Sequence, residues 1–168
     1  MRRFGYYFSS AVGRQWAERS AGLFTALGLP SAPAAEDAVY PLQQSSCPAL
    51  YASAARVDSA ADETVLLGPG VLRAEAYALF LGLAREWSSA AWPVDSVEVQ
   101  DANGQPIAGV TVTLGGAVEL ETDRLGRVRF ARTEQGPMTA EVDDPRVHAR
   151  AILLDSTRGV VLTGRRAP

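Results

Sequence analysis

The sequence predicts a two-part protein, with an α+β N-terminal domain over residues 1–90 followed by an all-β sandwich over residues 95–165. Near the start, apolar residues recur with helical spacing, and near the end short segments alternate between apolar and polar residues. A Ser- and Pro-containing stretch at 88–93 separates the two patterns. With 168 residues, 47% of them hydrophobic, the chain is long enough for two small domains.

Residues 4–28 have the pattern of an amphipathic helix. Apolar or small residues recur at spacings of three and four, which places them on one helical face. These residues are Phe8, Val12, Trp16, Ser20, Leu23 and Leu27. Gly28 suits the left-handed position that ends a helix, and Pro30 prevents its continuation. The Pro- and Ala-rich residues 30–37 predict a loop.

The middle of the chain predicts two extended stretches, at 39–42 and 49–54, and then a polar turn over 58–63. Gly68-Pro69-Gly70 predicts a break. Residues 71–87 fit two patterns. One is a strand-like alternation around Arg73, Glu75 and Tyr77, and the other is a helical stripe formed by Leu72, Ala76, Leu79, Leu83 and Trp87. The abundance of Ala, Leu, Glu and Arg favours the helix.

From residue 95 onward the sequence predicts seven short strands. Val, Leu, Ile or Phe alternates with Thr or charged residues in each segment, and turn signals separate the segments at regular intervals. This pattern is typical of an antiparallel sandwich. Val112 and Phe130 belong to the apolar sets of their strands, so we expect both to point into the core.

Two motifs in this region resemble a known family. The run VEVQDANGQPIAGVTV at 97–112 resembles the opening of the carboxypeptidase regulatory-like, transthyretin-type β-sandwich family, and TDRLGRVRF at 122–130 resembles its second hallmark. Asn103-Gly104 and Gly126 suit the positive φ that tight turns require. The resemblance implies an Ig-like sandwich without catalytic residues of its own. Such sandwiches occur in enzymes, secreted proteins and phage structural proteins, so the fold alone does not name a function.

The N-terminal part is similar to another family. A helix followed by AVYPL at 38–42 and CPALYA at 47–52 resembles the phage tail-terminator family, in which a helix precedes two such strands of a small mixed sheet. The resemblance implies a homo-oligomeric ring, with six copies, that contacts tail-tube or connector proteins in the virion. The family continues with a third strand, a further helix and another strand, whereas here the sandwich follows 71–87 almost directly.

The formal net charge is −3, all 16 basic residues are Arg, and both signs are mixed along the chain. A nucleic-acid surface requires a basic stripe, so we expect no direct nucleic-acid contact. Arg2-Arg3 and the small residues 32–34 faintly resemble a signal peptide, but the charges between them interrupt its apolar stretch, so we expect mature structure here. No apolar run approaches the length of a membrane span.

Few single residues suggest chemistry. The chain has one cysteine, Cys47, and one histidine, His148, so we expect no disulfide, no zinc site, no other metal, no cofactor and no catalytic residues. Small-hydrophobe packing is favoured over a reactive thiol for Cys47, and a solvent-facing strand position for His148. The loop carboxylates Asp123, Asp143 and Asp144 fit either Ca²⁺ binding or turn formation, with turn formation favoured.

The three tryptophans fit either an interface or the core. Trp92, in the linker, is the candidate interface residue, since aromatic residues are enriched in interface cores. For Trp16 and Trp87, packing in the core is an equally good interpretation.

These observations predict a non-enzymatic structural subunit of a phage virion, at the tail or the head–tail junction. The alternative is a decoration or surface-binding module whose sandwich engages a protein or glycan. A further alternative is a domain that accompanies an enzyme, although the chain carries no motif for that chemistry.

Overall fold

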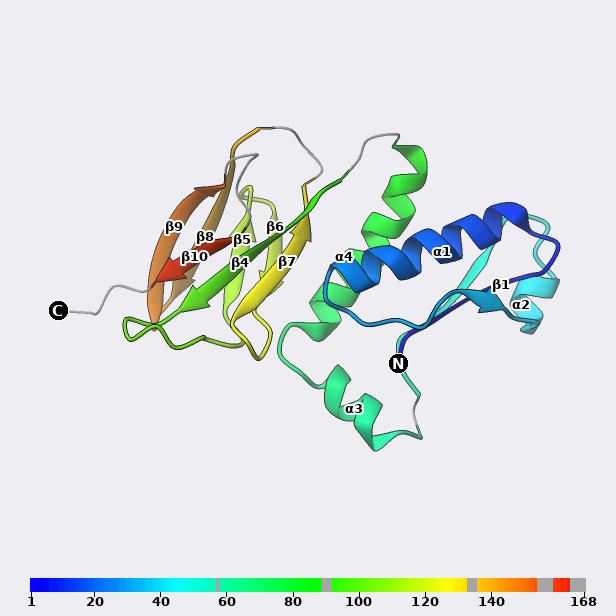
Figure 1. The fold of residues 1–168 in the computed structure, drawn as a ribbon, viewed down its shortest axis with the longest axis horizontal. Coiled ribbons are helices and arrows are strands. Elements are labelled where there is room, and N and C mark those ends of the chain that lie inside the picture. Colours follow the sequence, from blue (N-terminus) through cyan, green and yellow to red (C-terminus); the bar gives the residue numbers. More distant parts are fainter. Residues whose placement is uncertain (57, 89–91, 133–135, 154–158, 164–168) are drawn as a thin grey trace. The chain divides into compact units, whose positions relative to one another are not determined.

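The computed structural model is mixed α+β, with helices in the N-terminal part and strands in sheets in the C-terminal part (Figure 1). It describes residues 1–56, 58–88, 92–132, 136–153 and 159–163, without the side chains at 148, 150, 152 and 153. The chain divides into two compact units. The N-terminal unit contains residues 1–66 and 75–90, and the C-terminal unit contains residues 67–74 and 91–168. Part of the expected linker, residues 89–91, lies outside the described residues.

The N-terminal unit is built on a three-stranded mixed sheet in the order β2-β1-β3. Its elements are β1 (Arg3–Tyr6), α1 (Ala11–Ala26), β2 (Ala35–Glu36) and β3 (Leu50–Ser53). Strand β1 is parallel to β2 and antiparallel to β3. Helix α1 connects the parallel pair and packs on the sheet (Figure 1). The Phe24 ring meets Phe4 of β1 edge-on, with centroids 5.0 Å apart.

Helix α1 ends where the sequence predicts but begins later. Gly28 has a φ of 81°. Its N–H donates to Thr25 while the Leu29 N–H donates to Phe24, which is a Schellman ending. The expected start at residue 4 is wrong because residues 3–6 form β1. Ser10 caps the helix instead, since its side chain accepts a hydrogen bond from the Gly13 N–H.

The face of α1 that packs inward differs from the predicted one. The buried residues are Gly13, Ala17, Ser20, Ala21, Leu23 and Phe24. The first half of the predicted stripe, Phe8 and Val12, is exposed. Gly13 explains the difference: a Cβ there would lie 2.5 Å from the Ala49 carbonyl oxygen. Small residues of α1 therefore face inward, because the start of the helix lies close to the backbone of Ala49.

Two short helices replace parts that the sequence predicted as extended or as a turn. Residues Tyr40–Gln43 form α2, so the extended stretch at 39–42 is wrong; Pro41 is tolerated in a first helical turn, where N–H groups lack partners. Helix α3 (Ala60–Leu66) replaces most of the polar turn. The helical alternative for 71–87 is confirmed as α4 (Val71–Ala84) and a short 3₁₀ turn, η1 (Arg85–Trp87).

Seven strands are described in the C-terminal unit, at the positions that the alternating segments indicate. They are β4 (Val94–Gln100), β5 (Thr111–Leu114), β6 (Val118–Glu121), β7 (Arg127–Ala131), β8 (Met138–Asp144), β9 (Val147–Leu153) and β10 (Val160–Thr163). They form two sheets, β10-β4-β7 and β6-β5-β8-β9. The expectation of purely antiparallel pairing is wrong, because β10 runs parallel to β4. Strands β4 and β10 are the first and last strands of the unit. They can pair in parallel because the chain between them passes through the sheet β6-β5-β8-β9 before it returns.

Alternate residues of both sheets form the core of the C-terminal unit. Val97 and Val99 of β4 are fully buried, as is Val112 of β5, and Phe130 of β7 is 1% exposed. The predicted inward orientation of Val112 and Phe130 is confirmed. Thr122 is also fully buried, and its hydroxyl accepts from the Val110 N–H at 3.0 Å and donates to the Ile107 carbonyl at 2.7 Å.

Two turns with the spacing D-x-x-G-x have the same geometry. The Asp101 carboxylate accepts from the Asn103 and Gln105 N–H groups, and Asp123 accepts in the same way from Leu125 and Arg127. The glycines of the two turns, at 104 and 126, have positive φ. Hydrogen bonds from the Gln105 and Asn103 N–H groups lower the pKa of the Asp101 carboxyl. Their stabilising effect is present above the unfolded-state pKa and is lost as the pH falls through the folded one.

We predict that Val112→Asp and Phe130→Asp each lower the free energy of unfolding by about 4 kcal/mol or more, because each buries an unpaired charge. The matched control is Val161→Asp, at a position in β10 that is 54% exposed. It should change stability by about 0.5 kcal/mol or less. Urea unfolding followed by circular dichroism measures all three. Equal stability of Val112→Asp and Val161→Asp would contradict the strand register.

Candidate assembly surface

Four large exposed apolar residues of the N-terminal unit lie together on α4 and η1. Leu79, Leu83 and Trp87 follow each other at intervals of four residues and are 43%, 50% and 80% exposed. Phe80, which is 65% exposed, is adjacent. We call these four residues the apolar face. Large exposed apolar groups in one place are typical of interaction sites.

A different set of residues lies on the buried side of α4. Glu75, Ala78 and Leu81 are buried, at helical spacing. The stripe predicted for this helix therefore exists, but it faces outward. Of the two interpretations left open for Trp87, packing in the core is wrong, because its side chain is 80% exposed, while Trp16 of α1 is half-buried.

A groove of about 340 Å³ adjoins the apolar face. Its lining comes from α1, from α4 and from the start of β3, and consists of Trp16, Ser20, Ala49, Leu50, Leu79, Gly82 and Leu83. Leu79 and Leu83 thus belong both to the groove and to the apolar face. The groove and this face form one continuous, largely apolar surface.

Small residues allow the two helices to approach under this groove. A Cβ added to Gly82 of α4 would lie 3.2 Å from the Ser20 hydroxyl of α1, tighter than most such contacts. Arg19 of α1 and Glu86 of η1 are joined by an ion pair of 3.3 Å. Small and charged side chains therefore contribute to the contact between α1 and α4, while Leu79 and Leu83 stay at the groove, on the exposed side.

A buried ion pair lies on the inward side of α4. The Arg2 Nε donates to the Glu75 carboxylate, and both side chains are more than nine-tenths buried. Removing one partner would leave the other charge buried and unpaired, so the pair favours an inward position for Glu75. Leu79, Leu83 and Trp87 lie on the exposed side of the same helix and its 3₁₀ turn. The sequence carries no signal for the ion pair because 73 positions separate its partners.

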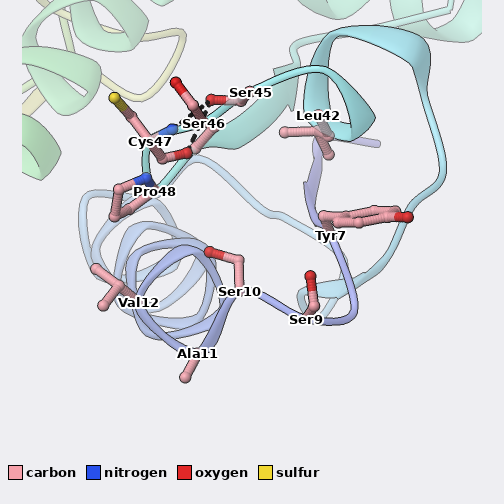
Figure 2. Close-up of a pocket in the computed structure, with 11 residues that line it drawn as sticks. Tyr7, Ser9, Ser10, Ala11, Val12, Leu42, Ser45, Ser46, Cys47 and Pro48 are labelled. Atoms are coloured by element: carbon pink, nitrogen blue, oxygen red, sulfur yellow. Dashed lines mark hydrogen bonds between the residues drawn. The ribbon is translucent and has the colours of Figure 1, made fainter.

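A second hollow lies beside the start of α1, and Figure 2 shows its lining. It has a volume of about 330 Å³ and polar hydroxyls from Ser9, Ser10, Ser45 and Ser46. The Ser10 hydroxyl is already used as the cap of α1, and Ser45 forms hydrogen bonds with the Cys47 backbone. The hydroxyls of Ser10 and Ser45 therefore organise the local backbone.

The remaining residues singled out from the sequence are distributed over both units. Trp92 is half-buried just before β4, and its interface role stays a prediction. Cys47 is exposed, so the expectation that it packs as a small hydrophobe is wrong. The His148 backbone lies in β9, but its side chain is outside the described part. Asp123 and Asp144 accept backbone N–H groups in their own turns, which confirms turn formation at these two positions.

Within the described ranges, no group of three or more His, Cys, Asp or Glu side chains is placed to hold a metal ion. In the same ranges no single helix is long and apolar enough to cross a membrane; α3 and α4 with η1 meet the length and composition criteria only as a pair, bent by 82°.

Comparison with known proteins gave no relative: no protein-family model and no curated protein matches the chain.

We predict that Glu75→Gln lowers the free energy of unfolding by about 3–5 kcal/mol, because it leaves the buried Arg2 charge uncompensated. Glu18→Gln is the control, since it removes an exposed pair with Arg14 on α1 and should cost about 0.5 kcal/mol or less. The double variant Arg2→Met/Glu75→Leu should recover most of the loss. Urea denaturation measures each. Equal losses for Glu75→Gln and Glu18→Gln would contradict a structural role of the pair.

Proposed function

We propose that the chain is a non-enzymatic structural subunit of a phage virion, at the tail or the head–tail junction. In this proposal the N-terminal unit associates with further copies of itself into a ring, and the C-terminal unit is an Ig-like, transthyretin-type sandwich. The observation that carries the proposal is the apolar face of α4 and η1, together with its groove.

The apolar face suits repeated contact between copies. Interface cores are depleted of charged residues and enriched in aromatic ones, and the face consists of two leucines, a phenylalanine and a tryptophan. Leu79 and Leu83 project beside a groove on the same unit. A subunit that offers a projecting surface and a recess can form head-to-tail contacts, and such contacts close into a ring when the rotation between copies permits.

The N-terminal topology supports the likeness to tail terminators in part. Helix α1 precedes two strands of a small mixed sheet, and the CPALYA motif leads into one of them, β3, the expected strand. The central strand β1 lies before the helix and has no counterpart in the likeness. The AVYPL motif departs from the likeness because it contributes a helical turn in place of a strand. The number of copies, six, rests on the resemblance alone.

The C-terminal unit supports an Ig-like sandwich through its two sheets and its two matching turns. The hallmarks that resemble the transthyretin-type family contain the residues that hold these turns, Asp101 and Asp123, and the buried Thr122. In the proposed subunit this unit projects from the ring or contacts a neighbouring virion protein.

We predict that the full chain forms a closed oligomer and that Leu83→Asp reduces it to monomers, because a charge at an apolar contact opposes association. The side chain is half exposed within the chain, so the melting temperature should stay close to that of the wild type. Light scattering after size exclusion and negative-stain microscopy measure the assembly.

Leu125→Asp is the matched control, since Leu125 is 58% exposed but lies in a turn of the C-terminal unit. It should leave the oligomer intact. A wild-type chain that stays monomeric at high concentration, or equal assembly of Leu83→Asp and wild type, would contradict the ring.

The virion role is tested by deleting the gene in the phage that encodes it. Tails of uncontrolled length, or heads that do not join tails, are the expected result for a ring at the tail end. Normal tails that lack only a surface projection would replace the ring proposal with a decoration role.

A further inference from the structure

The segment Leu67–Ala74 belongs to the C-terminal unit although it lies far from that unit's strands in the sequence. It contains the Gly-Pro-Gly break and the first turn of α4. Two of its residues contact β6, which is the edge strand of its sheet. Open edges of this kind invite pairing with other chains unless something covers them.

Gly70 makes the closest approach. A Cβ at this position would lie 2.3 Å from the carbonyl oxygen of Glu121, and its φ is +71°. The next residue, Thr122, donates its N–H to Val110, toward β5. The N–H and C=O groups of successive residues in an antiparallel strand point to alternate sides. Those of Thr122 point to β5, so those of Glu121 point to the free edge. Gly70 therefore lies against the open side of β6, and its backbone conformation and the available space both require glycine.

Arg73 adds an electrostatic contact. Its guanidinium lies 3.2 Å from the Glu121 carboxylate and 3.6 Å from that of Glu119. The two glutamates lie two residues apart on one strand and therefore share a face. All three side chains are partly exposed, and exposed ion pairs contribute little to stability. Pro69 completes the contact: its Cβ lies 3.8 Å from where a Cβ of Gly109 would be.

We propose that Leu67–Ala74 is a latch that closes the free edge of β6 and opens locally while both units stay folded. Among the described residues, the contacts of the docked segment include a close backbone approach at Gly70, a proline contact and partly exposed ion pairs. Exposed ion pairs contribute little to stability, and segments held by such contacts open at a fraction of the free energy of global unfolding. The latch is independent of the proposed role in a virion.

Hydrogen exchange of the full chain, followed by mass spectrometry, tests the latch. In the wild type, residues 67–74 should exchange faster than the central strand β8. Gly70→Ala should accelerate exchange at 67–74 by about tenfold or more and leave β8 and β1 unchanged, because the methyl group displaces only the latch. The matched control is Gly116→Ala in the β5–β6 turn, where φ is +72° but no atom lies within 4 Å of the added Cβ.

Reversing the charges tests the contact of Arg73 with the glutamates of β6. Arg73→Glu should accelerate exchange at 67–74 by about threefold, consistent with an exposed pair. Arg73→Glu combined with Glu121→Arg should restore the wild-type rate. Two results would overturn the latch. One is equal exchange at 67–74 in Gly70→Ala and Gly116→Ala. The other is acceleration by Gly70→Ala of β8 as much as of 67–74, which would make the segment part of the global unfolding unit.

Discussion

The buried ion pair between Arg2 and Glu75 is the constraint on which the N-terminal unit depends. Either charge alone would be buried without a partner, so the pair favours the rotation of α4 in which Glu75 points inward. In this rotation Ala78 and Leu81 are also buried, and Leu79 and Leu83 lie outside. The ion pair and these buried apolar residues act together on the choice of which surface of the unit is exposed.

Both units bury large apolar residues and leave others exposed. The N-terminal unit buries Phe4, Phe24 and Leu81, and the C-terminal unit buries Phe130 and the valines of β4. What distinguishes α4 and η1 is that Leu79, Leu83 and Trp87 recur at intervals of four residues on one exposed stripe. Exposed apolar area that is not used within a chain favours contact between chains. This stripe is why the proposed self-association is assigned to the N-terminal unit.

Polar contacts define the ends of the C-terminal unit. The Asp95 carboxylate binds Arg132 after β7 and accepts from the Gly159 N–H before β10, so one side chain joins three parts of a sheet. Asp101 and Asp123 organise two turns, and Thr122 supplies a buried donor and acceptor between them. Each of these groups is satisfied by backbone or by an opposite charge, as burial requires.

Local chemistry determined much of this fold. Alternation located the strands of the C-terminal unit and the inward side chains of Val112 and Phe130, and Gly28 marked the end of α1, because these features depend on near neighbours in the chain. Tertiary structure alone decided the rest. The spacing of Leu79 and Leu83 identified a helical face but did not indicate whether that face points into the unit or outward. This orientation depends on contacts with distant residues, such as that between Glu75 and Arg2, which lie 73 positions apart. Likewise, only the folded chain brings Gly70 against Glu121 and β10 beside β4, because periodicity within a segment carries no information about which distant segment it meets.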